Sequence, residues 1–373
     1  MNVIFTCGGT GGHINPAIAL ANTLRTRDPN VNILFVGCIG EMEEQLVPKA
    51  GFEIKCLPGS RFFRQLNMKN IKRNIQGVGR IISALNGARK IINDFKPDVI
   101  VGTGGYASFP ALFMGARMGV PTCVHEANAV PGLATRLAAG SADRILVNFA
   151  ESGKAYKQQD KVTCVGMPVR SEFLYTKRAD ARKELGLDER PLIISAFGSL
   201  GAKAMNQVMA DFMKLETENG LPFQHIHATG SYGWEWMPEL VKEKGVDLNS
   251  GSIDMREYIY NMPTLMAAAD VFISRAGASS CNEIAVSGTP CILIPSPNVT
   301  DNHQEKNARI VEQRGGCVLL LERECTAQRL YQEVQSLLND GEKRSAMRKA
   351  LMESSMPDSA DRICDIIVEL SNQ

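Results

Sequence analysis

Short runs rich in apolar residues alternate along almost the whole chain with longer stretches in which apolar residues recur at helical spacing. The runs at residues 3–7, 31–37 and 98–101 are typical of strands that are buried on both faces of a sheet. Strands that alternate with helices in this way are typical of parallel sheets covered by helices. The pattern therefore predicts an α/β protein with doubly wound parallel sheets.

The second half of the chain repeats the order of elements of the first half. Residues 3–20 predict a strand, a glycine turn and a helix, and residues 192–209 predict the same three elements. Residues 98–125 run from an aspartate and a strand to a Gly-Val-Pro turn and a second strand, and residues 270–294 do the same with Gly-Thr-Pro. We therefore expect two Rossmann-like doubly wound domains. Because ligands bind beyond the carboxyl ends of the strands in such sheets, the domains are expected to face each other across a cleft.

Sequence breakers indicate where the domains end. Gly166 and Pro168 interrupt the pattern after the last strand of the first half, and Pro357 precedes a final predicted helix at residues 358–370. We expect this last helix to pack back on the first domain. The sequence thus predicts three segments, at residues 1–166, 167–355 and 356–373.

The composition is that of a globular protein, with 44% apolar and 22% charged residues in a chain of 373. The net charge of +1 gives no indication of nucleic-acid binding. No apolar run approaches the roughly 18 residues that span a bilayer, and the first residues predict a strand rather than an export signal. The ten cysteines include no CxxC pair and mostly lie in or beside apolar runs, which indicates buried thiols in a reducing cytosol.

The first predicted strand runs directly into a glycine-rich turn at residues 8–12, which is followed by His13. Backbone N–H groups in such a turn can approach a phosphate closely, and the dipole of the next helix adds partial positive charge. Asn15 and Pro16 predict the N-cap and the first residue of that helix. The turn lacks the third glycine of a dinucleotide fingerprint and the Lys-Ser/Thr pair of a P-loop, so neither a nicotinamide site nor an ATPase site is favoured.

Six short motifs occur in order across both predicted domains, at residues 8–13, 102–106, 125–128, 198–201, 274–283 and 301–307. Together they resemble the MurG family of cell-wall N-acetylglucosaminyltransferases over essentially the whole chain. The resemblance implies the GT-B architecture and transfer of GlcNAc from UDP-GlcNAc to the 4-hydroxyl of MurNAc in undecaprenyl-pyrophosphoryl-MurNAc-pentapeptide. This is an inverting step of peptidoglycan biosynthesis, and the resemblance implies neither a cofactor nor a bound metal.

The resemblance implies a donor site in the second domain, built from residues that contact the phosphates, the ribose, the uracil or the sugar: Arg170, Ser199, Ile259, Ala278, Ser279, Ser280, Glu283 and Gln304. Ser279 and Ser280 would bind the diphosphate at a helix start, and Glu283 would accept hydrogen bonds from the ribose hydroxyls. The spacing of Ser280 and Glu283 is also that of a capping box, which needs no ligand.

The other donor residues have structural alternatives as well. Gln304 would bind sugar hydroxyls but also fits a polar helix start, and His303 precedes it where the family often has glutamine. Ile259 would contact uracil through its backbone, or belong to the core. Arg170 is either a phosphate or sugar contact or a surface residue near the linker, and Ser199 is either a phosphate contact or a turn residue.

In the first domain the resemblance implies that one group of residues faces the pyrophosphate of the acceptor: Thr10, Gly11, Gly12, Gly104, Gly105 and Tyr106. Asn128 would contact the transferred sugar. Its segment is also rich in turn formers, which explains Asn128 without a ligand.

Inversion in a single displacement requires a base that removes the proton of the acceptor hydroxyl. His13 is the first candidate, because a helix N-terminus disfavours imidazolium and so favours a neutral ring that accepts a proton. Glu126, at the end of a predicted strand, is the second candidate, and a purely structural role for His13 is the alternative. His225 and His227 share one face of a predicted strand, but without further ligands nearby they do not predict a zinc site.

Residues 61–96 carry nine Lys or Arg and one acid, Asp94. Phe62 and Phe63 lie in a predicted basic loop just before a helix, on one face of which apolar residues recur, at Ile71, Ile75, Val78, Ile82, Leu85 and Ile92. An apolar patch surrounded by cations is typical of a segment that binds an anionic membrane surface. We therefore expect a peripheral protein on the cytoplasmic side of the cell membrane. The alternative is a stripe that packs on the sheet with its charges in solvent.

Three other functions fit the same sequence pattern. A UDP-GlcNAc 2-epimerase of the same fold has no use for the basic segment at residues 61–96. A diacylglycerol glycosyltransferase of similar architecture differs in its acceptor. A nucleotide-sugar sensor at the membrane would bind UDP-GlcNAc but would release no UDP when the acceptor is added.

Overall fold

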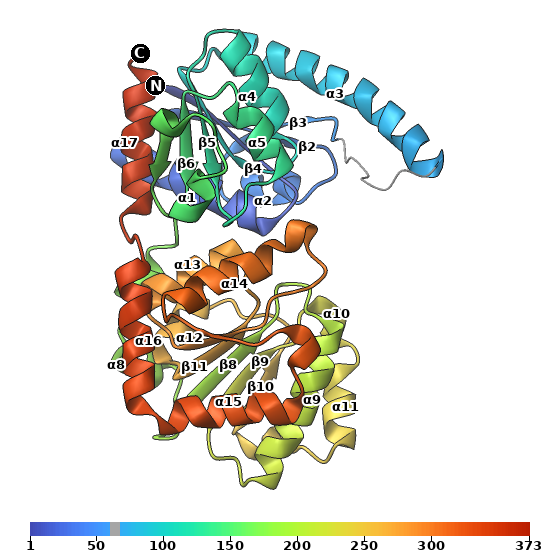
Figure 1. Cartoon of the computed structure of the whole chain (residues 1–373), viewed down its shortest axis with the longest axis vertical. Coiled ribbons are helices and arrows are strands. Elements are labelled where there is room, and N and C mark those ends of the chain that lie inside the picture. Colours follow the sequence, from blue (N-terminus) through green and yellow to red (C-terminus); the bar gives the residue numbers. More distant parts are fainter. Residues whose placement is uncertain (60–67) are drawn as a thin grey trace. The chain divides into compact units, whose positions relative to one another are not determined.

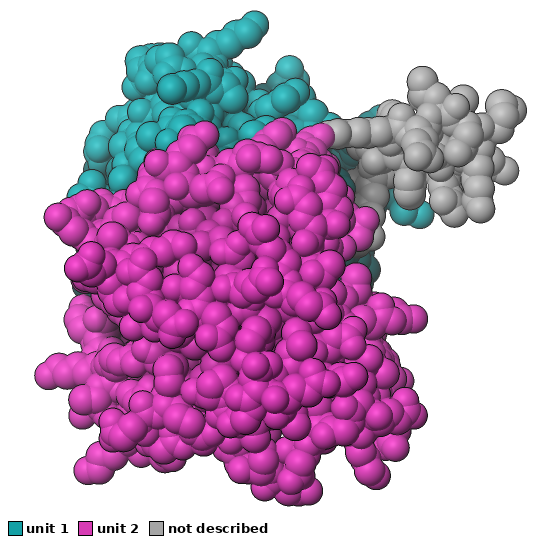
Figure 2. Space-filling view, turned by 60° about the horizontal axis from the view of Figure 1, so that its bottom comes forward, with its two compact units in different colours: residues 1–169, 356–373 teal, residues 170–355 magenta. Residues whose placement is uncertain are grey.

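The chain divides into two compact units, which Figure 2 distinguishes by colour: Met1–Val169 with Met356–Gln373, and Arg170–Ser355. The computed structural model describes residues 1–59 and 68–373, and for residues 68–78 it describes the backbone alone. The first division comes shortly after Gly166, where the sequence suggested a domain limit. Because the last segment returns to the first unit, the second unit is an insertion in the sequence of the first.

The first unit contains a seven-stranded sheet in the order β3-β2-β1-β4-β5-β6-β7, in which every adjacent pair is parallel. Its strands are β1 (Asn2–Cys7), β2 (Asn32–Cys38), β3 (Glu53–Leu57), β4 (Val99–Gly104), β5 (Thr122–Glu126), β6 (Arg144–Val147) and β7 (Val162–Cys164). Its helices are α1 (Gly11–Arg27), α2 (Glu43–Lys49), α3 (Met68–Phe95), α4 (Ser108–Arg117), α5 (Leu133–Ala139), α6 (Ala150–Gly153) and α17 (Ser359–Ser371).

Helices cover both faces of this sheet, which explains why its strands are almost continuously apolar. Successive residues of a strand point to opposite faces. Val3 and Phe5 of β1 accordingly pack into one apolar cluster with α1 and α17, whereas Ile4 packs into another with α3, α4 and α5.

The C-terminal helix α17 belongs to the core of the first unit (Figure 1). It packs against α1, and the apolar cluster that they share includes four fully buried α17 side chains: Ile363, Cys364, Ile367 and Leu370. Arg27 at the end of α1 also forms ion pairs with Asp361 (2.6 Å) and Asp365 (2.7 Å). Partly exposed pairs of this kind contribute about 0–1 kcal/mol each, so the buried apolar surface is the main attachment of α17.

The second unit contains a six-stranded sheet in the order β10-β9-β8-β11-β12-β13, again with every adjacent pair parallel. Its strands are β8 (Leu192–Ala196), β9 (Gln224–Ala228), β10 (Ile253–Arg256), β11 (Val271–Ser274), β12 (Cys291–Leu293) and β13 (Val318–Leu319). Its helices are α7 (Glu172–Tyr175), α8 (Arg178–Glu184), α9 (Lys203–Glu218), α10 (Ser231–Trp234), α11 (Met237–Glu243), α12 (Met262–Ala268), α13 (Ala278–Ser287), α14 (His303–Gln313), α15 (Ala327–Asn339) and α16 (Gly341–Ser354).

In each unit an aspartate just before one central strand holds the start of the neighbouring strand. Asp98 precedes β4 and accepts a hydrogen bond from the N–H of Asn2 (2.7 Å) in β1. Asp270 precedes β11 and accepts one from the N–H of Leu192 (2.9 Å) in β8. β1 and β4 are paired, as are β8 and β11. The repetition seen in the sequence therefore extends to individual hydrogen bonds.

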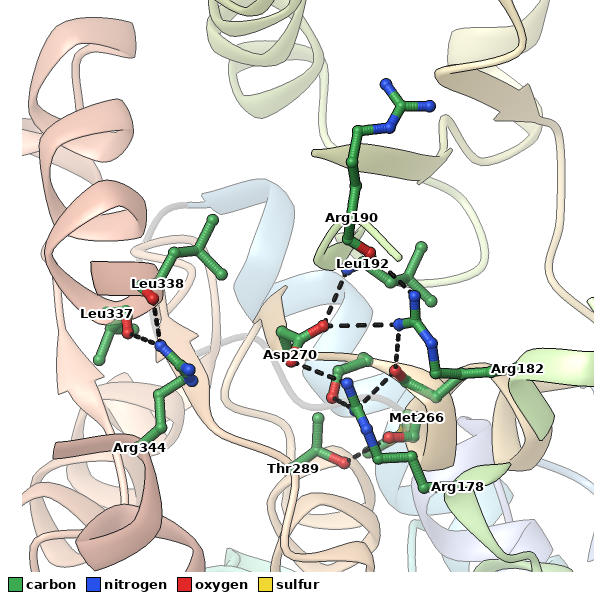
Figure 3. Close-up of polar contacts among 12 residues, drawn as sticks. Arg178, Arg182, Arg190, Leu192, Met266, Asp270, Thr289, Leu337, Leu338 and Arg344 are labelled. Atoms are coloured by element: carbon green, nitrogen blue, oxygen red, sulfur yellow. Dashed lines mark hydrogen bonds and ion pairs between the residues drawn. The ribbon is translucent and has the colours of Figure 1, made fainter. Parts of the chain in front are cut away.

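Asp270 also binds two arginines of α8 (Figure 3). Arg178 Nη2 lies 2.8 Å from Asp270 Oδ1, and Arg182 Nη1 lies 3.7 Å from Oδ2. Arg178 donates further to the carbonyl oxygens of Ala268 (2.7 Å) and Ala269 (2.8 Å) at the end of α12. The Asp270 side chain is 18% exposed and that of Arg178 is 40% exposed, so this carboxylate joins α8, α12 and β8 at a position partly shielded from water.

The start of α1 differs from the sequence-based prediction. The helix begins at Gly11, with Thr10 as the N-cap, and the carbonyl oxygen of Thr10 accepts from the N–H groups of His13 (3.0 Å) and Ile14 (3.1 Å). Asn15 and Pro16, predicted as the N-cap and the first residue, lie inside the helix. The prediction was wrong because glycines 11 and 12 adopt helical as readily as turn conformations.

The Asp270 cluster gives a testable stability difference. We expect D270N, which removes the charge but keeps the size, to lower the free energy of unfolding of the second unit by about 2 kcal/mol, because two cations lose their partner. Denaturant unfolding followed by circular dichroism measures the change. D254N is the matched control, since Asp254 pairs with Arg256 (2.6 Å) at a position 49% exposed and its loss is expected to cost at most about 1 kcal/mol. Equal losses in the two variants would contradict the role given to Asp270.

Candidate functional site

The first candidate site lies where the turn after β1 meets the turn after β4. Gly104 and Gly105 have φ angles of 107° and 87°. A β-carbon on Gly105 would lie 2.2 Å from the carbonyl oxygen of Gly8, and one on Gly104 would lie 2.5 Å from Nδ1 of His13. Any larger residue at these positions would push the turns apart, so the contact requires glycine.

His13 lies in the first turn of α1, with its half-buried ring against the end of β4. Its Nδ1 lies 3.1 Å from the carbonyl oxygen of Thr103, and the Thr103 hydroxyl donates to the carbonyl oxygen of His13 (2.7 Å). Because a carbonyl oxygen only accepts, Nδ1 carries the proton of this bond. In the neutral ring the lone pair is then on Nε2, which is the atom able to take up a proton.

Glu126, the second candidate base, ends β5 and is buried. Its Oε1 accepts from the N–H of Asn128 (2.9 Å), and its Oε2 accepts from the N–H of Gly132 (3.0 Å). Burial raises the pKa of Glu126, and hydrogen bonds from Asn128, Gly132 and Thr135 oppose that shift. Both oxygens thus bind the loop that carries Asn128, so the geometry favours a positioning role for Glu126 over removal of a substrate proton.

The other residues expected in the first site lie at the same edge of the sheet. Thr10 is exposed, Gly11 and Gly12 are half-buried, and Tyr106 is half-exposed. They follow β1 and β4, whereas Asn128 follows β5, and these three strands are neighbours in the sheet. The fold therefore brings together residues from three separate motifs.

His125, for which the sequence left function and simple hydrogen bonding open, has a structural role. Its ring is buried, and Nε2 donates to the carbonyl oxygen of Gly166 (2.8 Å). Burial lowers the pKa of His125 to about 4, so the ring is neutral at pH 7. A β-carbon on Gly166 would lie 2.7 Å from Cβ of Met356. His125 thus ties β5 to the place where the chain leaves and re-enters the first unit.

The N-terminus of α13 forms the centre of the second candidate site. Gly277 is the N-cap, and no side chain caps the helix. Ser280 and Glu283 lie inside the helix, so the capping box that their spacing suggested is absent. The Ser279 hydroxyl is buried and has no hydrogen-bond partner within the described ranges. An unpaired hydroxyl beside the first N–H groups of a helix is suited to bind a phosphate oxygen.

Glu283 and Arg170 come together although they are far apart in the sequence. Arg170 precedes α7, which packs against α13, and its guanidinium lies 5.2 Å from the ring centre of Phe173. Burial raises the pKa of Glu283 to about 7, and the positive charge of Arg170 opposes this shift. A carboxyl group with this pKa changes its charge close to neutral pH.

Two hydrogen bonds fix α14 next to the same site. The Asn307 side chain donates to the carbonyl oxygen of Ala276 (3.1 Å), just before α13, and Gln304 Oε1 accepts from the N–H of Ser296 (2.9 Å). The Gln304 amide nitrogen is the group left to donate to a ligand. His303 Nδ1 donates to a carbonyl oxygen in the turn before α14 (2.8 Å), so it takes part in the local turn.

Ile259 and Ser199 lie on the loops after β10 and β8, two strands that are separated by β9 in the sheet. The Ile259 side chain is buried in the core, as the structural alternative held, between the exposed Tyr258 and Tyr260. No backbone hydrogen bond joins Ile259 to another described residue, which leaves its N–H and C=O able to meet a ligand. Ser199 is exposed in the turn between β8 and α9.

His225 and His227 belong to a buried series of hydrogen-bonded side chains. Ser195 Oγ lies 2.7 Å from His225 Nε2 and 2.6 Å from His227 Nδ1, and Glu216 Oε1 lies 2.8 Å from His225 Nδ1. Burial lowers the pKa of His227 and raises that of Glu216. A group of three or more side chains suited to hold a metal ion is absent from the described residues.

The basic segment at residues 61–96 is described only in part. Phe62 and Phe63 lie outside the described residues. Three side chains in the later part of α3 are buried in the core of the first unit: Ala84, Ala88 and Ile92. Ile82 is 56% exposed instead, so the predicted apolar stripe does not form a single buried face. Within the described ranges, no helix has the length and apolar character needed to cross a bilayer.

Comparison with protein families matches residues 3–147 to the N-terminal domain of glycosyltransferase family 28 and residues 193–363 to its C-terminal domain. The chain belongs to glycosyltransferase family 28. A relative from Acetivibrio thermocellus is 40% identical over 99% of this chain and 98% of its own length. That relative is named UDP-N-acetylglucosamine–N-acetylmuramyl-(pentapeptide) pyrophosphoryl-undecaprenol N-acetylglucosamine transferase.

Solved structures show that the family-28 chain has the GT-B fold. The crystal structure of Acinetobacter baumannii MurG matches it with a TM-score of 0.77 at 23% identity, over 99% of both chains. UDP-GlcNAc 2-epimerase from Neisseria meningitidis, bound to UDP-GlcNAc, matches with a TM-score of 0.67 at 13% identity, over 99% of this chain and 100% of its own. These structures show a shared fold alone, so membership of family 28 is what separates this chain from the epimerases.

One residue and one spatial relationship at these sites were missed by sequence reasoning. Thr103, which orients His13, lies inside the motif at residues 102–106, but its role depends on which backbone group the imidazole meets. The electrostatic effect of Arg170 on Glu283 depends on contact between α7 and α13. Neither relationship has a signature in a single sequence.

Proposed function

We propose that the protein transfers GlcNAc from UDP-GlcNAc to the 4-hydroxyl of MurNAc in undecaprenyl-pyrophosphoryl-MurNAc-pentapeptide, with inversion at the anomeric carbon. The observation that carries this proposal is the end-to-end similarity to family-28 relatives named for this transfer, 40% identical in the case of A. thermocellus. The product would be the lipid-linked disaccharide-pentapeptide of peptidoglycan synthesis.

His13 is the general base of the proposed reaction. Its Nε2 takes the proton of the acceptor hydroxyl while that oxygen bonds to the anomeric carbon and the bond from this carbon to UDP breaks. The hydrogen bond from Nδ1 to Thr103 (3.1 Å) supports this role, because it keeps the lone pair on Nε2. A positioned base of this kind contributes about 10²–10⁴-fold to the rate.

The donor would bind at the N-terminus of α13 in the second unit. The N–H groups of Ala278, Ser279 and Ser280 and the buried Ser279 hydroxyl would hold the diphosphate and stabilise the charge that develops as UDP departs. The remaining donor contacts would come from the other residues at this edge: Arg170 and Ser199 to phosphate, Glu283 to the ribose, Ile259 to uracil through its backbone, and Gln304 to the sugar.

The acceptor would bind at the first site. The N–H groups of Gly11 and Gly12, with Thr10 and Tyr106, would face its pyrophosphate, where the dipole of α1 attracts negative charge. Asn128, whose N–H bonds to Glu126 (2.9 Å), would contact the sugar. Glu126 supports that loop in the proposal.

We also propose that residues 61–96 bring the protein to the cytoplasmic face of the membrane, where a polyprenyl-linked acceptor resides. The support is the excess of nine Lys or Arg over one acid in this segment. Anionic lipid attracts such a segment by roughly 1 kcal/mol per cation near the surface.

The proposed base is tested by two substitutions at His13. We expect H13A to lower kcat by about 10²–10⁴-fold and to leave UDP affinity almost unchanged, since UDP binds to the other unit. UDP release from UDP-GlcNAc with a short-chain acceptor analogue measures turnover, and calorimetry measures UDP binding. H13N keeps a donor for the Thr103 carbonyl but removes the base, so it should be as impaired as H13A. An active H13N, or an equal loss of UDP affinity, would contradict the assignment.

The same assay distinguishes the other functions. Formation of ManNAc and UDP from UDP-GlcNAc alone would indicate an epimerase. UDP release with diacylglycerol as acceptor would indicate a lipid glycosyltransferase of another pathway, and tight donor binding without UDP release would indicate a sensor.

Glu283 gives a prediction for pH dependence. The ionised carboxylate accepts hydrogen bonds from the ribose hydroxyls, and the pKa of Glu283 is about 7, so acidification protonates the group and weakens UDP binding. We expect the Kd of UDP to rise about tenfold between pH 8 and pH 6 beyond the change seen in E283Q, which shares only the ionisation of UDP itself. Calorimetric titration of both proteins measures the difference. If the Kd of UDP changes equally with pH in the two proteins, Glu283 does not bind the ribose as a carboxylate and its role is structural.

Membrane attachment is tested at the paired phenylalanines. F62S/F63S should reduce sedimentation with liposomes of anionic lipid and spare turnover of a water-soluble acceptor analogue, because only insertion of apolar side chains is lost. Y258S/Y260S is a control with two exposed aromatics in the second unit. Unaltered sedimentation of F62S/F63S would remove these residues from the attachment.

A further inference from the structure

Glu43, the first residue of α2, is completely buried although it is an acid at a helix start. Its Oε2 accepts from the N–H of Gly9 (2.9 Å) in the turn after β1, and its Oε1 accepts from the N–H of Cys38 (2.9 Å) at the end of β2. The next residue, Glu44, is exposed and accepts from the N–H of Gly40 (2.7 Å). Glu43 is thus buried, whereas the adjacent Glu44 lies in solvent.

The space for the Glu43 side chain is created by two glycines. A β-carbon on Gly8 would lie 2.4 Å from Glu43 Oε1, and a β-carbon on Gly37 would lie 2.5 Å from Glu43 Cγ. Real β-carbons do not approach other atoms this closely, so the two strand ends accommodate the carboxylate only because both positions lack a side chain. The fit indicates that the glycine turn after β1 and the Glu43 side chain are packed directly against each other.

The bond to Gly9 connects Glu43 with His13 through a short series of backbone contacts. Gly9 has a φ of 82°, and the next residue, Thr10, is the N-cap of α1. The carbonyl oxygen of Thr10 accepts from the N–H of His13 (3.0 Å), whose ring bonds to Thr103. The position of the Gly9 peptide therefore fixes where α1 begins and where the imidazole lies.

We propose that Glu43 is a positioning residue for the acceptor half of the reaction. It holds the turn at residues 8–12 so that the N–H groups of Gly11 and Gly12 face the acceptor pyrophosphate and His13 Nε2 faces the acceptor hydroxyl. Glu43 does not contact substrate and acts only through Gly9. This inference rests on the proposed function, because the turn binds an acceptor only in that proposal.

The substitution E43Q tests the proposal with almost no change of volume. The amide presents a donor to one of the two N–H groups that the carboxylate satisfies, so one bond is lost and the Gly8–Gly9 peptide shifts. A misplacement of about 1 Å at a reacting group lowers the rate by about a hundredfold. We therefore expect kcat/KM for the acceptor to fall by at least about tenfold, with the Kd of UDP unchanged, because UDP binds to the second unit.

Hydrogen exchange gives a readout that does not depend on turnover. Amide exchange at residues 9–13 should be faster in E43Q than in the wild-type protein, because loss of one of the two hydrogen bonds of Glu43 loosens its hold on this turn. E44Q is the matched control, and it should retain wild-type kinetics and wild-type exchange at residues 9–13, since its bond to Gly40 lies at the surface.

Three results would overturn the proposal. These are an E43Q protein with wild-type kcat/KM, an equal loss of UDP affinity in E43Q, and unchanged exchange at residues 9–13. If E43Q does not fold, G8A decides, because its β-carbon displaces the carboxylate from the other side and should give the same kinetic split. Absence of wild-type turnover would overturn the proposed function together with this inference, whereas an active wild type with an unaffected E43Q overturns this inference alone.

Discussion

The first candidate site depends on the direct contact of two glycine turns, one after β1 and one after β4. The carbonyl oxygen of Gly8 occupies the place where a β-carbon on Gly105 would be, and this contact brings the His13 ring onto the end of β4. The second unit also has a close approach of two turns, but after a different pair of strands: a β-carbon on Gly201, after β8, would lie 2.0 Å from the carbonyl oxygen of Thr229, after β9. In each unit the carboxyl edge of the sheet is therefore assembled largely from backbone, and a single added carbon would separate its turns.

Buried carboxylates complete this edge in the first unit. Glu43 accepts one N–H from the turn after β1 and one from the end of β2, and Glu126 accepts two from the loop after β5. Burying a carboxylate is unfavourable unless hydrogen bonds replace its water, so each acid favours the backbone conformation that supplies both of its donors. In the proposal, the loops that surround the acceptor site are thus ordered by acids that bind backbone rather than substrate.

The fold could be predicted from the sequence because its signals are repeated. Apolar strands alternate with helices in both halves, and Asp98 and Asp270 occupy equivalent positions before paired strands. The predictions of local structure were wrong where the same residues are compatible with several conformations. Pro16 is compatible with the first position of a helix and with its interior, and Ser280 and Glu283 have capping spacing without capping. Nothing in the sequence separates Glu43 from the exposed Glu44, since their environments depend on strands brought together by the fold.

The insertion of the second unit into the first affects how the chain folds during synthesis. Domains usually fold as units from the N-terminus while the ribosome is still translating. Here the apolar face of α1 lacks its cover until α17 has been made, and α17 follows the whole of Arg170–Ser355. The apolar side chains of α1 that pack on α17 therefore stay exposed to solvent while Arg170–Ser355 is translated. If translation stops, or a protease cuts the chain, before residue 359, this apolar surface stays exposed. Exposed apolar surface is what chaperones and proteases act on.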